Sequence, residues 1–143
     1  MSENPGNGPQ AVLERMHRAL NSRDLDAYVG CYAPDYRSVQ PIHPDWEYSG
    51  QEQLRWNWTG IFENVPDFQA ELLRSTIDGD TVWSEWRWSG TQPDGMPMVV
   101  VGVIIMGVEN DQIAWGRIYM ESEAGGRLSF NEGRTRDPEK LDA

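Results

Sequence analysis

The chain has 143 residues, of which 38% are hydrophobic, so it can bury one core of ordinary size and forms one domain. Its formal net charge of −11 argues against nucleic acid and membrane surfaces as partners, because both attract clusters of Lys and Arg. The only cysteine, Cys31, has no partner for a disulfide within the chain.

The first residues are rich in Gly, Pro and Asn, which predicts a flexible lead at 1–9. This segment lacks the basic and apolar regions of a secretory signal, so we expect a cytoplasmic protein. AVLERMHRAL, at 11–20, and DLDAYVGCY, at 24–32, then place apolar residues at helical spacing. Two amphipathic helices are therefore expected to open the domain.

A short strand, a loop and a third helix are predicted next. DYRSVQPI reads as the strand, and the loop after it contains His43 and Asp45. Ser49 and Glu52 have the spacing of a capping box, which predicts that a helix begins there. An apolar stripe continues along this helix until Pro66 ends it.

The remaining pattern predicts four strands in an antiparallel meander, followed by a polar tail at 124–143. The strands are FQAELLRSTI, TVWSEWRWSG, MVVVGVIIMGV and QIAWGRIYMES. The third strand is the longest apolar run of the chain, but it reaches only about half of the ~20 residues that a membrane-spanning helix needs. Both of its faces are apolar, and the helices can cover only one. We therefore expect a homodimer, in which a second copy covers the other face.

The second strand carries three tryptophans. Because alternate side chains of a strand face opposite ways, Trp86 and Trp88 share one face, whereas Trp83, Glu85 and Arg87 share the other. A β-bulge would exchange these faces locally and bring the charged pair inside. For the two tryptophans that share a face, core filling and ligand stacking both remain open.

The segment AVLERMHRALNSRDLDAYVGCYAPDY, the helix after it and the closing DQIAWGRIYMES resemble the SnoaL-like branch of the nuclear transport factor 2-like superfamily. The resemblance covers 10–123, which we take as the domain. It implies an α+β fold, a cone-shaped α+β barrel in which three N-terminal helices pack on a curved antiparallel sheet and enclose a pocket. Many relatives pair through the outer face of the sheet, in agreement with the expected homodimer.

Related enzymes carry acids and bases at positions that hold other residues here. The histidine and aspartate of SnoaL-type cyclases are matched by Ile104 and Ile118, and the tyrosine and aspartate of ketosteroid isomerases by Met16 and Gln40. The arginine and one aspartate of limonene-type epoxide hydrolases are matched by Trp86 and Trp88, and another aspartate is matched by Ile118. The resemblance thus implies a pocket without the usual catalytic acids, and the expected ligand-binding residues are Met16, Gln40, Trp86, Trp88, Ile104 and Ile118.

We interpret this pocket as the site of a small hydrophobic metabolite, cyclic or polyketide-like, bound without a cofactor. No metal is expected, because two histidines far apart and one cysteine make a poor ligand set. Two alternatives remain. In the first, the chain is an acid-base enzyme, an isomerase or polyketide cyclase, in which His43 or Asp45 is the base and Gln40 polarises a carbonyl. In the second, the chain is a pure dimerisation module whose cone is filled by its own side chains.

Overall fold

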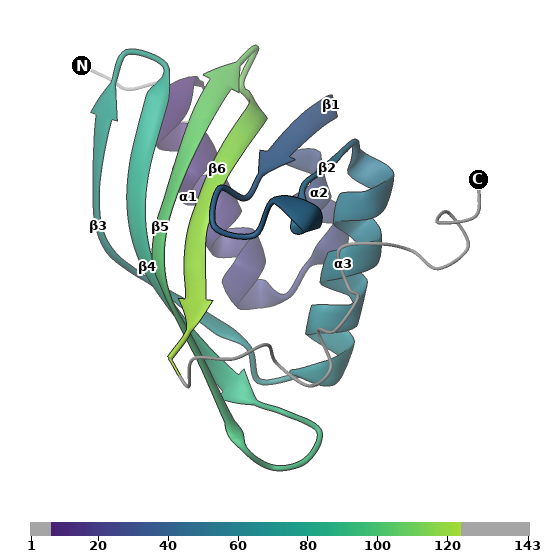
Figure 1. Cartoon of the computed structure of the whole chain (residues 1–143). Coiled ribbons are helices and arrows are strands. Elements are labelled where there is room, and N and C mark those ends of the chain that lie inside the picture. The colour runs from purple at the N-terminus through teal and green to yellow at the C-terminus, as the bar shows by residue number, and fades with distance from the viewer. Residues whose placement is uncertain (1–6, 124–143) are drawn as a thin grey trace.

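Residues 7–123 are described by a computed structural model of the whole chain, in which three helices pack on the concave side of a curved sheet (Figure 1). The helices are α1 (Gly8–Ser22), α2 (Leu25–Gly30) and α3 (Gln51–Asn64). The strands are β1 (Tyr32–Val39), β2 (Tyr48–Ser49), β3 (Gln69–Asp78), β4 (Thr81–Thr91), β5 (Pro97–Glu109) and β6 (Gln112–Ser122), and a 3-10 helix, η1 (Pro44–Trp46), lies between β1 and β2. The predicted tail at 124–143 lies outside the described residues, as does 1–6 of the predicted lead.

The first two helices lie where the apolar periodicity predicts them. The buried residues of α1 include Val12, Met16 and Leu20, which recur at helical spacing and face the sheet. Asp24 caps α2, because its carboxylate accepts a hydrogen bond of 3.1 Å from the backbone N–H of Ala27. None of the helices among residues 7–123 is long and apolar enough to cross a membrane.

α3 begins close to the predicted position, but the predicted capping box is wrong. Ser49 lies in β2, and the residue at the N-cap is Gly50, whose φ of 94° is a conformation that glycine adopts without strain. No side chain caps this helix. Ser49 and Glu52 have the spacing of a capping box but do not form one, because β2 pairs with β1 and holds Ser49 in an extended conformation.

The sheet has six strands in the order β2-β1-β6-β5-β4-β3 and remains open. The antiparallel meander of β3 to β6 is confirmed. The fold class is confirmed as well, but the sheet is mixed rather than antiparallel, because β1 runs parallel to β6. Between β1 and β6 the chain passes through α3 and four strands, β2 to β5, so no hairpin dictates their relative direction.

The two faces of β4 are those that the alternation predicts. The pairing of β4 with β5 runs without a bulge from Thr81 to Thr91, so the parity holds throughout this pair. Trp86 is completely buried on the inner face, whereas Trp83 is 47% exposed on the outer face. Glu85 and Arg87 consequently belong to the outer face.

Candidate functional site

A cavity of about 160 Å³ lies between the helices and the inner face of the sheet. Its walls come from α2 and α3 on one side and from β1, β2, η1 and strands β4 to β6 on the other. No charged side chain lines it. The walls divide into an aromatic and aliphatic part and a part that carries hydroxyl and amide groups.

The apolar part is built around three aromatic rings. Trp88 of β4 lies with its ring centroid 5.4 Å from that of Trp58 on α3, at 76° between the planes, and 5.9 Å from that of Phe68. Edge-to-face contacts of this kind are favoured between aromatic rings. Met98, Met106 and other aliphatic side chains of the sheet complete this part. The surface suits a flat, apolar molecule.

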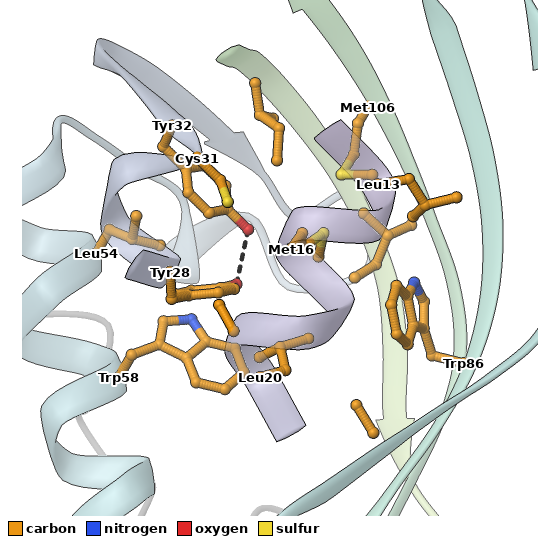
Figure 2. Packing of buried hydrophobic residues seen from close by; sticks show 14 of the residues in the cluster. Leu13, Met16, Leu20, Tyr28, Cys31, Tyr32, Leu54, Trp58, Trp86 and Met106 are labelled. Carbon is orange, nitrogen blue, oxygen red and sulfur yellow. Dashed lines mark hydrogen bonds between the residues drawn. The ribbon is translucent and has the colours of Figure 1, made fainter. Parts of the chain in front are cut away.

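The polar part is a cluster of four tyrosines, Tyr28, Tyr32, Tyr36 and Tyr48, that our interpretation of the sequence did not foresee. The hydroxyl of Tyr32 donates a hydrogen bond of 2.6 Å to the hydroxyl of Tyr28, as Figure 2 shows. The ring centroids of Tyr32 and Tyr36 are 4.6 Å apart, edge to face. Hydroxyl groups therefore face this end of the cavity in the place where only Gln40 was expected.

Burial keeps these hydroxyls protonated. It raises the pKa of Tyr28, Tyr32 and Tyr48 well above the ordinary value, and the pKa of Tyr36 to about 12, because the anion would lose its hydration. For Tyr36 a hydrogen bond with Ser38 partly offsets this rise. At neutral pH the cluster offers uncharged groups that can donate or accept hydrogen bonds.

Two buried polar side chains support the cluster. Ser38 is 2% exposed and Asn57 is 8% exposed, and both form hydrogen bonds with Tyr48. Asn57 also accepts a hydrogen bond of 3.0 Å from the side-chain amide of Gln53. Strand alternation could have found part of this group, since Tyr36 and Ser38 share one face of β1 and Gln40 follows at the same spacing just after the strand ends.

The structure brings four of the six expected ligand-binding residues to the cavity: Gln40, Trp88, Ile104 and Ile118. Met16 and Trp86 do not line it. In Figure 2, Trp86 lies on the far side of α1 from the Tyr28–Tyr32 pair. Its Nε1 donates a hydrogen bond of 2.8 Å to Oγ of Ser84, so Trp86 is a satisfied core residue. Alternation predicted its face, but the helix over that face determines what it touches.

His43 and Asp45 lie at the edge of the site rather than in its wall. Nε2 of His43 is 2.5 Å from Oε2 of Glu121, and the His43 ring stacks on Trp46 at a centroid distance of 3.8 Å. Trp46 lines the cavity, whereas His43 does not. Asp45 is exposed. The partner of His43 is thus Glu121, from a strand 78 positions away, which no local pattern could indicate.

Within the part of the chain that the structure describes, no group of three or more His, Cys, Asp or Glu side chains is arranged to hold a metal ion.

The family model described as "SnoaL-like domain" matches residues 13–115. No curated protein matches the chain. Among solved structures, IdmH of Streptomyces antibioticus, a proposed polyketide cyclase, is 21% identical with a TM-score of 0.67, covering 82% of this chain and 94% of its own. A SnoaL-like protein of unknown function from Burkholderia thailandensis is 19% identical with a TM-score of 0.62, covering 80% and 93%. At these identities the likeness shows the fold alone.

A ketosteroid isomerase-like protein from Catenulispora acidiphila, solved in complex with trimethylamine, is also similar in structure. It is 16% identical with a TM-score of 0.67, and the match covers 79% of this chain and 86% of its own. The binding of trimethylamine is an observation on that protein alone.

The raised pKa values of the tyrosine cluster predict how alkali unfolds the protein. The unfolded chain releases these protons near pH 10, whereas the folded chain holds them, so their contribution to stability is complete below about pH 10 and falls as the pH rises further. The variant Tyr119→Phe contains only the four cluster tyrosines. We expect its tyrosinate absorbance to appear together with the loss of circular dichroism. Ionisation of these tyrosines near pH 10 in a folded protein would contradict the prediction.

Proposed function

The chain belongs to the SnoaL-like domain family, and we propose that it binds a small, uncharged, cyclic molecule in the cavity between its helices and its sheet. The cavity itself is the observation that carries the proposal, since a dimerisation module with a filled cone would need no such space. Its volume of about 160 Å³ is similar to that of an engineered cavity of about 150 Å³ that binds benzene. One six-membered ring with a short substituent matches this space.

The lining favours a ligand that is both apolar and uncharged. A charged group in the cavity would lose its hydration without meeting an opposite charge, which is strongly unfavourable. Aromatic side chains at Trp58 and Trp88 offer surfaces on which a ring can stack. Ile104 and Ile118 cannot transfer protons, so these two wall positions supply shape rather than acid-base chemistry.

Methionine methyl groups can test where such a ligand binds. Met98, Met106 and Met120 line the cavity, whereas Met16 is a buried residue of α1 outside the cavity wall and Met96 is 59% exposed. We expect acetophenone to shift the ¹³C-methyl NMR signals of the three cavity methionines and to leave those of Met16 and Met96 unchanged. Equal small shifts at all five, or no saturable shift at the cavity signals, would contradict binding in this cavity.

The alternative of acid-base catalysis is favoured by one contact, the pair of His43 and Glu121 at 2.5 Å. A carboxylate that holds an imidazole in one orientation is a common arrangement around a catalytic histidine. Stacking on Trp46 brings this pair beside a wall residue of the cavity. If the protein is an acid-base enzyme, Glu121 rather than Asp45 is the carboxylate that pairs with His43.

Exchange of the methyl protons of acetophenone with D₂O, followed by NMR, tests this alternative. If His43 is the base, the wild type accelerates exchange and His43→Ala lowers the rate by a factor on the order of 100. Glu121→Gln should lower it less, because it keeps the size of the side chain. A loss confined to Asp45→Ala would identify Asp45 as the base, and exchange at the buffer rate in the wild type would exclude this reaction.

The outer face of the sheet is the second feature for which we propose a partner, namely a second copy of the chain. An apolar stripe of half-buried residues runs along β5: Val99, Val101, Val103 and Ile105. Arg87 and Glu85 lie beside it on β4, and Glu121 and Arg117 lie beside it on β6. A two-fold interface pairs a surface with itself, and a face with an apolar centre and both signs of charge at its sides can be complementary to its own copy.

Replacing Val101 with Glu should break this dimer, because an unpaired charge buried in an interface costs several kcal/mol. We expect sedimentation to show a dimer for the wild type at roughly tens of micromolar, an ordinary range for stable interfaces, and monomers or aggregates for Val101→Glu. Gln10→Glu adds the same charge at an exposed position of α1 and should remain dimeric. A monomeric wild type at this concentration would refute the proposal.

A further inference from the structure

The indole Nε1 of Trp88 is buried, and no described residue accepts its hydrogen. Two positions earlier on the same strand, the indole of Trp86 has a partner in Ser84 at 2.8 Å. Both side chains are on the inner face of β4, yet only Trp88 borders the cavity. The unpartnered donor therefore belongs to a side chain that borders the cavity, whereas the partnered one belongs to a side chain of the packed core.

An indole N–H can only donate a hydrogen bond. Buried polar groups in folded proteins almost always have a partner, and a buried donor without one is unfavourable. The polar oxygens of the cavity include those of Gln40, Ser38 and the tyrosines, but none of them accepts this hydrogen. The ring contacts with Trp58 and Phe68 restrain the indole, so it cannot simply turn toward solvent. An acceptor atom on a ligand would remove the deficit.

We propose that Trp88 is a specificity-determining residue, which donates its Nε1–H to an uncharged acceptor oxygen of the ligand. The inference rests on the proposed function and adds a chemical class to it: a small cyclic compound with a carbonyl or similar acceptor, rather than a hydrocarbon of the same shape. The tyrosine cluster is a second place where a ligand oxygen could be bound, but hydroxyls also accept hydrogen bonds and already bond to one another. The indole N–H of Trp88, in contrast, can only donate.

Charged acceptors are excluded by the same walls. A carboxylate would satisfy the indole, but no cation lines the cavity to compensate the loss of its hydration. Three flat molecules of nearly equal size separate these cases: acetophenone has a carbonyl oxygen, α-methylstyrene has a methylene in its place, and benzoate has a charged carboxylate. Because the three shapes are alike, differences between their dissociation constants report the effects of the acceptor oxygen and of its charge.

Calorimetric titration of the wild type should give about tenfold tighter binding of acetophenone than of α-methylstyrene, as one hydrogen bond to a buried donor implies. Benzoate should bind more weakly than either. In Trp88→Phe, which keeps an aromatic ring but lacks the donor, the two neutral ligands should bind about equally. Trp83→Phe changes an exposed indole of the outer face and should keep the tenfold preference.

A second measurement needs no change at the cavity. In the NMR spectrum of the wild-type protein, the indole N–H signal of Trp88, assigned by its loss in Trp88→Phe or by ¹⁵N-edited contacts to Phe68, should move downfield with acetophenone and not with α-methylstyrene. This readout remains valid even if Trp88→Phe fails to fold.

The outcomes separate the two proposals. Equal affinity of the wild type for the two neutral ligands would overturn the role of Trp88 while leaving cavity binding intact. If Trp88→Phe still prefers acetophenone to α-methylstyrene, the selectivity belongs to the tyrosine hydroxyls, and the role of Trp88 is again overturned. Tightest binding of benzoate would overturn the requirement for an uncharged oxygen. Failure of every ligand to bind the wild type would overturn the proposed function, and this inference with it.

Discussion

At Gly102 the backbone of β5 passes so close to β6 that a Cβ there would lie 2.0 Å from the carbonyl oxygen of Tyr119. The φ of 150° at this glycine is one that other residues rarely adopt. Such a kink in a long strand allows a sheet to bend sharply. The bend matters for the site, because helices could cover the whole inner face of a flat sheet. The sheet is curved (Figure 1), and a cavity remains between it and the helices.

The distribution of that volume follows from where the helices lie. α1 covers the part of the inner face that carries Trp86, and its buried side chains fill that space. The shorter α2 and the more distant α3 instead present Tyr28 and Trp58 across the gap. The cavity therefore has hydroxyls toward one end and aromatic rings toward the other. The hydroxyls at one end are hard to ionise because they are buried, and the rings at the other end have no ionisable group, so the cavity offers no charge to a ligand.

The segment between β1 and β2 joins the two surfaces for which we propose partners. Trp46 lies in the cavity wall and stacks on His43, and His43 bonds to Glu121. Glu121 pairs with Val101 in the sheet, on the face where we propose that a second copy binds. The side chains of His43 and Trp46 thus connect Glu121 on the outer face to the cavity, so the two interactions that we propose would share these side chains.

The amino-acid sequence by itself determined the order of helices and strands, the meander and the opposite faces of Trp83 and Trp86, because each follows from periodicity over a few neighbouring residues. Only the tertiary structure decided that β1 runs parallel to β6, that His43 meets Glu121, and that four tyrosines converge. Trp86 and Trp88 show the reason most directly. Alternation places both on the inner face, but whether an inward side chain meets another side chain or an open volume depends on which helix crosses above it, and that is determined by contacts between segments far apart in the chain.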